Sequence, residues 1–416
     1  MRTGRRELIR DLNRALVLNL VRERRAISRA EIARVTGLSP STVTSITASL
    51  LADELLVEEG PATKREAKRD KSGAVGRPAS LLRVDPKARH VIGVKLAPES
   101  LTATVTDLDA EPMAMVALPH GAQATLDEIV ELFDSAIDRL RSDAGLGEEQ
   151  PLGIGVGLPG SVDPAGGNVV RSPLPGWVNE DLAGTLESRL GTPVFIDNDV
   201  NTLTVAEHLY GSGRGVDHLL VVTIGRGIGM GTVIDGAIVR GARGALGEIG
   251  HVPAVPDGHE CWCGKHGCLE AEAAEPAIVR DVLAAVDRLV RPEEMATAAD
   301  GDERIAAILR AAGRLVGIAV GSAVTLLDPQ RVVVSGEGVR LGHHYIDGIR
   351  DGVLACLLSE AEPELVFEPW GDETWARGAA SLVLRELFTP AHLRGERHPA
   401  GSQSTSRGEP SSAAAS

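Results

Sequence analysis

Aromatic residues, cysteines and long apolar runs are scarce in this sequence. Aromatic side chains make up only 2% of its 416 residues, so the core must consist mainly of Ala, Val, Leu and Ile. No stretch reaches the roughly 18 consecutive apolar residues that a membrane-spanning helix needs. Residues 1–12 alternate charges and contain no apolar segment of the kind found in secretory signals. These absences predict a globular, cytoplasmic protein without a membrane partner.

Charge is distributed unevenly along the chain. The formal net charge is −15, but residues 1–90 contain 19 Lys and Arg against 11 Asp and Glu, a surplus of +8. The rest of the chain therefore has a net charge of −23. A basic segment joined to an acidic body predicts that the segment, and not the body, binds a polyanion. The alternative is a solvated charged surface.

Residues 14–59 have the pattern of a small helical unit. A helix over residues 29–35 is expected to begin at Ser28, with Glu31 completing a capping box, and to end at Gly37. The next helix begins at Pro40 after a short turn. Two helices joined by such a turn form a helix-turn-helix. The side chains expected to contact DNA are Ser39, Ser41, Thr42 and Ser45.

Two short strands are expected next, at residues 55–57 and 81–84. A charged loop at residues 64–71 and a tight turn at Gly76-Arg77-Pro78 lie between them. This is the layout of a wing, and Arg77 at its tip is predicted to enter the minor groove of operator DNA. The alternative is a small helical bundle with a hairpin that binds no DNA.

A different pattern begins near residue 89. Strand-like apolar runs alternate with helical segments, and several runs end in glycine-rich turns. Strands are expected at residues 91–96, 101–107, 152–158, 194–196, 219–224 and 331–334, and helices at 126–140, 277–290 and 303–327. The alternation predicts an α/β fold that binds ligands at the carboxyl ends of its strands. Residues 390–416 lack a core pattern and are expected to form a disordered tail.

Three of the four cysteines gather in one short segment. Cys261, Cys263 and Cys268 follow His251, and the glycines between them allow tight bends. Three thiolates and one imidazole suit a four-coordinate zinc ion, and a site closed by four protein ligands is structural, not catalytic. The alternative is a disulfide with a spare thiol, which a reducing compartment disfavours.

Several motifs taken together resemble the ROK family of repressors, open reading frames and sugar kinases. The most specific are Gly-Glu-Ile-Gly-His at 247–251 and Cys-x-Cys-Gly-x-x-Gly-Cys-Leu-Glu at 261–270; others lie at 157–163, 174–177 and 198–201. The resemblance covers nearly all of residues 10–390. It implies a winged helix-turn-helix over residues 1–88, followed by an actin-like, hexokinase-like domain of two α/β lobes over residues 89–389.

The resemblance also implies a sugar site. The family's sugar contacts correspond here to Asn198, Asp199, Glu248, His251 and Glu270. Asp199 matches the base that activates the sugar hydroxyl in kinase members, and is expected to be a relic of that role. His251 has two distinct ring nitrogens, so it can bind zinc with one and a sugar hydroxyl with the other.

The chain departs from the kinase pattern where the family binds ATP. Kinase members have Asp-x-Gly-Gly-Thr in the first hairpin, whereas this chain has Lys95, Ala97, Pro98 and Glu99 there. Pro98 has no N–H to donate to a phosphate, and Glu99 adds negative charge. Arg226 and Glu337 alter the other two glycine turns of the nucleotide side. The sequence therefore predicts that the protein is not an enzyme.

The resulting hypothesis is a DNA-binding transcriptional regulator, a repressor of carbohydrate-related genes whose degenerate kinase-like domain senses a sugar or amino sugar. Two alternatives stay open. One is an ATP-dependent sugar kinase with a regulatory head, and the other is a regulator that uses the domain only to dimerise. The expected assembly is a homodimer or a dimer of dimers, because helix-turn-helix proteins read paired half-sites.

Overall fold

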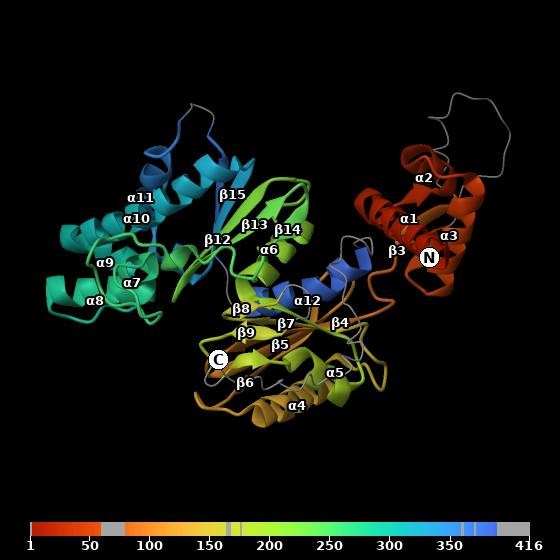
Figure 1. Cartoon of the computed structure of the whole chain (residues 1–416), viewed down its shortest axis with the longest axis horizontal. Helices are drawn as coiled ribbons and strands as arrows, with labels where there is room; N and C mark the ends of the chain where they lie inside the picture. The colour runs from red at the N-terminus through yellow and green to blue at the C-terminus, as the bar shows by residue number, and fades with distance from the viewer. Residues whose placement is uncertain are drawn as a thin grey trace, which may run out of the picture.

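The computed structural model describes residues 2–59, 80–163, 168–174, 177–358, 362–369 and 372–388. They form a small helical head and two lobes, each built on a five-stranded sheet (Figure 1). The head carries α1, α2, α3 and the N label, at the right of Figure 1, and lies beside the lobes. The two-lobed α/β architecture expected from the sequence is confirmed.

The head contains the predicted helix-turn-helix. Its elements are α1 (Arg2–Arg24), α2 (Arg29–Thr36), α3 (Pro40–Ala52), β1 (Ile27–Ser28), β2 (Leu56–Glu59) and β3 (Leu81–Val84). The Ser28 hydroxyl accepts from the Glu31 N–H at 3.2 Å, which caps α2 as expected. The Glu31 carboxylate, however, accepts from Arg34 at 3.4 Å, so the capping box is only half formed. Gly37 ends α2 at φ 70°, the left-handed conformation that favours glycine.

The strands β2 and β3 pair antiparallel and, with β1, form a three-stranded sheet in the order β1-β3-β2. This is the base of a wing. The charged loop at residues 64–71 and Arg77 lie outside the described residues, as does the tail at 390–416.

The first lobe is built on the sheet β11-β7-β4-β5-β6. Its strands are β4 (Val91–Ala97), β5 (Ser100–Thr106), β6 (Pro112–Pro119), β7 (Ile154–Leu158) and β11 (Val194–Asn198), with α4 (Leu126–Ala144) and α5 (Leu182–Leu190) as helices. A small sheet of β8 (Ser161–Val162), β9 (Val169–Arg171) and β10 (Val178–Glu180) extends it. The helix α4 begins with a complete capping box between Thr125 and Glu128.

The second lobe is built on the sheet β14-β13-β12-β15-β16. Its strands are β12 (Leu219–Ile224), β13 (Ile228–Ile234), β14 (Ala237–Val239), β15 (Arg331–Ser335) and β16 (Glu364–Glu368). Its helices are α7 (Leu269–Ala273), α8 (Glu275–Val286), α9 (Met295–Gly301), α10 (Glu303–Leu327) and α11 (His343–Leu354). Three short 3₁₀ turns lie at Ile249–His251, Pro292–Glu294 and Glu337–Leu341.

Among the described residues, only α10 is long and apolar enough to cross a membrane, with a mean hydropathy of 1.5 over an 18-residue window. The sequence analysis did not single it out. Half of that window is buried inside the protein. Leu309, Val316 and Val320 on its inner face belong to the core of the second lobe, so α10 has the burial of a core helix.

Two helices join the lobes: α6 (Asp199–Tyr210) and α12 (Asp372–Phe388). The helix α6 packs through Leu203 against the second sheet, while α12 lies across the first. A Cβ atom added to Gly93 in β4 or to Gly155 in β7 would come within 2.0 Å and 1.8 Å of the Ala376 and Ala379 carbonyl oxygens. Only glycine lets α12 approach the sheet this closely.

The head rests on the carboxyl ends of both joining helices. The Arg22 guanidinium of α1 lies 4.2 Å from the Phe388 ring of α12 and 5.6 Å from the Tyr210 ring of α6. The Asn19 amide donates to the Phe388 carbonyl. Buried Leu18 and Val383 belong to one continuous apolar cluster. The expected boundary at residues 88/89 therefore lies between β3 and β4 along the chain, but the apolar core runs across it.

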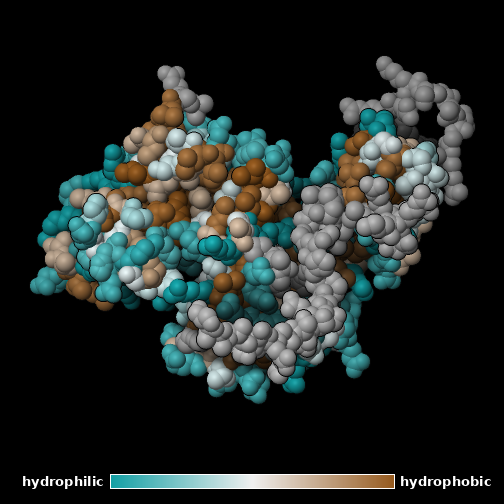
Figure 2. All heavy atoms as spheres, viewed as in Figure 1, coloured by the Kyte–Doolittle hydropathy of each residue, from teal (hydrophilic) through white to brown (hydrophobic). Residues whose placement is uncertain are grey.

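Apolar atoms gather on the outer surface of the second lobe, around α10, α11 and β15 (Figure 2). Ile318 and Leu326 of α10 are 40% and 82% exposed, and Leu354 of α11 is 44% exposed. Such a patch is a common feature of protein interaction surfaces.

Candidate functional site

The helix α3 presents a row of hydroxyl side chains. Ser39 caps the helix by accepting from the Thr42 N–H at 3.1 Å, and its hydroxyl also lies 2.9 Å from that of Ser41. Ser41 and Ser45 are exposed and Thr42 is half-buried, while Val43 and Leu50 face the core of the head. The helix therefore has the polar outer face that groove recognition requires.

A groove runs between α1 and α3 beside these hydroxyls. Arg10, Asn13 and Arg14 line one side, and Ser45 and Ser49 line the other. Arg14 donates to Ser49 at 2.8 Å and pairs with Asp53 at 2.7 Å, whereas Arg10 is exposed. Sequence analysis missed Arg10 and Arg14, although their spacing of four residues on a helix places them on one face.

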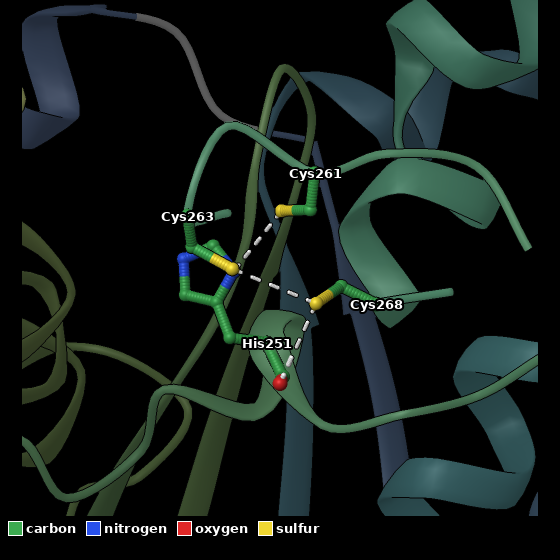
Figure 3. A group of neighbouring side chains, drawn as sticks. All are labelled: His251, Cys261, Cys263 and Cys268. Atoms are coloured by element: carbon green, nitrogen blue, oxygen red, sulfur yellow. Dashed lines mark hydrogen bonds between the residues drawn. The ribbon is translucent and has the colours of Figure 1, made fainter. Parts of the chain in front are cut away.

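The predicted metal ligands lie together. Potential ligand atoms of His251, Cys261, Cys263 and Cys268 all lie within 4.8 Å of one another, and Figure 3 shows them pointing toward a common centre. The Cys263 and Cys268 sulfurs are 3.7 Å apart, and the Cys261 sulfur is 3.5 Å from His251 Nδ1. Two thiolates bound tetrahedrally at the usual zinc–sulfur distance would be about 3.8 Å apart. The group can therefore hold a metal ion.

The alternative of a disulfide is not supported, because all four cysteines are free. Burial raises the pKa of both Cys261 and Cys268, so the protein alone favours thiols there. A bound cation reverses that preference, because metal ligation stabilises thiolates. The local backbone suits the cluster: Gly264 and Gly267 both have positive φ, at 87° and 68°.

A second group with metal-binding residue types lies at Asp300, His343 and His344. Here Arg310 lies 3.0 Å from Nδ1 of His344 and can only donate to it. That bond makes Nδ1 the acceptor, so Nε2 holds the ring proton and is closed to a metal. We assign no metal to this group.

The Asn198–Asp199 pair marks the start of α6. Asn198 caps the helix, accepting from the Val200 and Asn201 N–H groups at 2.9 and 3.2 Å, and donates to the Gly160 carbonyl at 3.0 Å. Its amide therefore fixes the turn that positions Asp199. Burial raises the pKa of Asp199, against the opposing effect of Lys95. A half-buried carboxylate at a helix N-terminus is suited to bind hydroxyl donors.

The other three predicted sugar residues come from the second lobe. Glu248 lies beside His251, with its Oε2 atom 3.9 Å from Nε2 of that ring. His251 therefore faces the Cys261 thiol with Nδ1 and Glu248 with Nε2. Burial raises the pKa of Glu248; His251 lowers it, while Asp199 and Glu270 raise it further. Glu248 therefore lies close enough to Asp199, His251 and Glu270 for their charges to act on it.

Glu270 lies in the first turn of the helix α7, two residues after Cys268. Its Oε2 atom accepts from the Ile228 N–H at 3.1 Å, and its Oε1 atom accepts from the Trp262 indole at 2.6 Å. The carboxylate is thus held in place from both sides. Sequence analysis missed Trp262 as a partner of this group, and the only available signal was its position between two cysteines.

The residues predicted to depart from the kinase pattern lie in two turns and on the adjoining strand. Pro98 and Glu99 form a tight turn between β4 and β5, and the Ala97 carbonyl oxygen lies 2.9 Å from the ring of His120. In the second lobe, the Glu337 carboxylate fills the space next to Gly225, 2.5 Å from where a Cβ would be. Lys95 lies 4.9 Å from the Trp375 ring and acts on Asp199.

A buried carboxyl group, that of Glu207, lies beside the half-buried carboxyl group of Glu368. Glu207, near the end of α6, is fully buried, and its Oε2 atom accepts from the Ser212 N–H at 2.8 Å. Its Oε1 atom has no hydrogen-bond donor in the described part of the chain. Burial, and then the carboxylate of Glu368 at the end of β16, raise the pKa of Glu207 to about 7. Glu368 also accepts from the Ser212 hydroxyl.

Known proteins that are similar to this chain belong to the family that its motifs resemble. The ROK family model matches residues 91–386. The DNA-binding transcriptional dual regulator NagC of Escherichia coli is 31% identical over 403 residues, covering 92% of this chain and 95% of NagC. The xylose repressor of Bacillus subtilis is 26% identical, covering 90% and 96%. Both relatives extend over the head as well as the lobes.

Solved structures agree on the fold. A ROK family transcriptional regulator, a homologue of E. coli MLC, superposes with a TM-score of 0.78 at 24% identity, covering 92% of this chain and 98% of the regulator. The ROK hexokinase of Thermus thermophilus has a TM-score of 0.61 at 32% identity, but covers only 70% of this chain and 96% of the hexokinase. The shared lobes, the metal-ligand cluster and the full-length likeness to regulators lead to one conclusion: the chain belongs to the ROK family.

Proposed function

We propose that the protein is a sugar-responsive transcriptional repressor that binds operator DNA through residues 1–88 and senses its effector through residues 89–389. The main support comes from the two relatives that are similar over nine-tenths of this chain. One is a transcriptional regulator and the other a repressor, and in both the similarity includes the head. The hexokinase matches only 70% of the chain. A winged helix-turn-helix has no part in sugar phosphorylation.

In this proposal α3 enters the major groove. Ser41, Thr42 and Ser45 contact base edges and phosphates, and Ser39 orients the helix start. Exposed Arg10 lies beside this row and adds a phosphate contact. Arg77 enters the minor groove. The basic surplus of the first 90 residues supports a binding constant that falls steeply with salt.

The effector is a sugar held between the lobes. Asp199 from the first lobe and Glu248, His251 and Glu270 from the second accept and donate hydrogen bonds to its hydroxyls, with Asn198 fixing the turn. A zinc ion held by His251 and the three cysteines has a structural task. It would keep Glu248 and Glu270, on either side of its ligands, in position.

Sugar binding between the lobes and DNA binding by the head are coupled through α6 and α12. Closing the lobes on a sugar changes how these two helices lie relative to each other. The head contacts both of them, through Arg22 on Tyr210 and Phe388, so its orientation changes too. In a homodimer or a dimer of dimers, two reoriented heads no longer match the half-site spacing. A coupling free energy of about 1–3 kcal/mol would change operator affinity roughly 5- to 150-fold.

The assembly is proposed to be a dimer through the apolar surface of the second lobe. Leu326 is 82% exposed there, which is unfavourable unless a second copy covers it. Sedimentation velocity should give a dimer for the wild type. Leu326→Lys should give monomers with unchanged folding, and a dimeric variant would place the interface elsewhere.

An ATP-dependent sugar kinase is the second candidate, favoured by the presence of Asp199. Three features oppose it: Pro98 at the turn, Glu99 beside it, and the Glu337 carboxylate against Gly225. Catalysis of phosphoryl transfer needs donors and cations around the phosphates, and these residues supply negative charge instead. A coupled assay with ATP and hexoses should give only background, and turnover that disappears in Asp199→Ala would establish a kinase.

The central experiment uses the full chain, because the core of the head continues into α12. Duplexes selected from a random pool give the operator, and a thermal-shift screen of monosaccharides and phosphosugars gives the effector. Fluorescence anisotropy should then show that the effector releases the operator. Absence of any selected duplex, even at low salt, would refute the proposal.

A further inference from the structure

Trp262 differs from the other two tryptophans that the structure describes. Trp177 and Trp375 are 4% and 7% exposed and belong to apolar cores, whereas Trp262 is 63% exposed. Leaving a large aromatic surface in water is unfavourable, because removing an indole ring from water lowers the free energy. In a chain with only 2% aromatic residues, an exposed indole at the candidate site calls for a ligand.

The indole is exposed but its position is fixed. Its N–H donates to Glu270 Oε1 at 2.6 Å, and its ring meets the His251 ring edge to face, with centroids 4.8 Å apart at 79°. Its chain neighbours Cys261 and Cys263 belong to the metal-ligand cluster. Trp262 is therefore held by two of the residues proposed to bind sugar hydroxyls, while most of its surface stays open.

The other described residues proposed for the site offer only polar groups to a sugar. Asp199, Glu248, His251 and Glu270 can bind hydroxyls, but a pyranose ring also presents a face of C–H groups. Aromatic faces offer an apolar surface for such groups, and Trp keeps a polar handle for orientation. The bond from Trp262 does not block Glu270, because each carboxylate oxygen has two lone pairs and can accept a second donor.

We propose that Trp262 is a specificity-determining residue, whose indole face packs on the C–H face of a pyranose while Glu270 and His251 bind its hydroxyls. This rests on the function proposed above and narrows its ligand class. The favoured ligands are pyranoses with mainly equatorial hydroxyls, because their axial hydrogens form a flat apolar face. Open-chain alditols with the same hydroxyls lack that face and should bind poorly.

The test uses the full-length protein and glucose, N-acetylglucosamine and xylose, each paired with its alditol where one exists. Tryptophan fluorescence follows binding directly, because Trp262 is an exposed indole beside the site. Its emission should shift when a sugar covers it. Trp262→Ala should weaken binding of the effector about tenfold or more, equivalent to about 1.4 kcal/mol. Trp262→Phe keeps an aromatic face and should recover most of the affinity, but without the spectral shift.

Two controls separate this role from damage to the loop. Metal content by elemental analysis should equal that of the wild type in both variants, since Trp262 supplies no ligand. His259→Ala alters the same loop at a residue bonded to Glu272, and should leave sugar affinity unchanged.

The outcomes distinguish the inference from the function on which it rests. A wild type that binds no sugar of any class overturns both. A wild type whose operator binding responds to a pyranose, with Trp262→Ala responding at the same concentration, overturns only the role of Trp262. Equal affinity for a pyranose and its alditol likewise overturns the proposed ligand class.

Discussion

Replacing Glu207 by Gln should remove a pH dependence of stability. Glu207 is fully buried, its Oε1 atom lacks a donor in the described part of the chain, and the Glu368 carboxylate lies beside it. Arg331 on the neighbouring strand pairs with Glu364 at 2.6 Å, so its charge is engaged there. A fully buried carboxylate beside a half-buried one is unfavourable when both are charged, and one shared proton supplies the missing donor.

The linkage between proton binding and folding gives the sign and the size of this pH dependence of stability. The pKa of Glu207 rises from 4.5 to about 7 in the folded protein, chiefly through burial and next through Glu368. The folded state therefore binds the extra proton between these values, and the stabilisation is complete below pH 4.5 and lost as pH rises to about 7. Each pH unit costs about 1.4 kcal/mol, so the free energy of unfolding should fall by about 3 kcal/mol over the window.

Glu207→Gln keeps the shape of the protonated acid. Its carbonyl can still accept from the Ser212 N–H, and its amide can donate to Glu368. Urea unfolding followed by circular dichroism from about pH 5 to about pH 8 should show that the variant lacks the 2–3 kcal/mol decline attributed to Glu207. Glu131→Gln, at an exposed position of α4, is the matched control and should keep the wild-type slope. Parallel profiles for wild type and Glu207→Gln would refute the shared proton.

Three further predictions concern signalling between sugar and DNA. Cys263→Ser should lower the bound metal to well under one ion per chain and abolish the sugar response, while operator affinity in the absence of sugar stays nearly unchanged. If the variant still dissociates from DNA when sugar is added, the supporting role of the metal is contradicted. Thr42→Ala should change the selected operator sequence, at a cost of about 1–3 kcal/mol at one base pair, whereas an unchanged sequence would remove Thr42 from base recognition. Arg22→Ala should leave sugar affinity, measured by calorimetry, unchanged. It should reduce the release of operator DNA, because it removes the contact of the head with Tyr210 and Phe388. Full release by the variant would show that coupling does not depend on this contact.

Local signals were enough to predict the helix-turn-helix and the metal cluster. Ser28, Gly37 and Pro40 determine where helices begin and end through contacts within a few residues, and the structure has them in those roles. The ligands from His251 to Cys268 likewise lie within one short segment, so their spacing was informative. The sugar residues could be predicted only through the family resemblance, because Asp199 and Glu248 come from different lobes.

What the sequence did not reveal depends on contacts between distant segments. Nothing in residues 372–388 indicates that α12 lies against Gly93 and Gly155, because a helix pattern does not specify its partner. Glu207 and Glu368 illustrate the same limit: each alone has the pattern of an ordinary surface acid, and only the fold buries Glu207 and brings Glu368 beside it. This matters for function, since α12 contacts the first sheet, α6 and the head. A movement of either lobe is therefore transmitted to a helix that the head contacts, and substitutions on the buried face of α12 should alter the coupling between sugar and operator DNA.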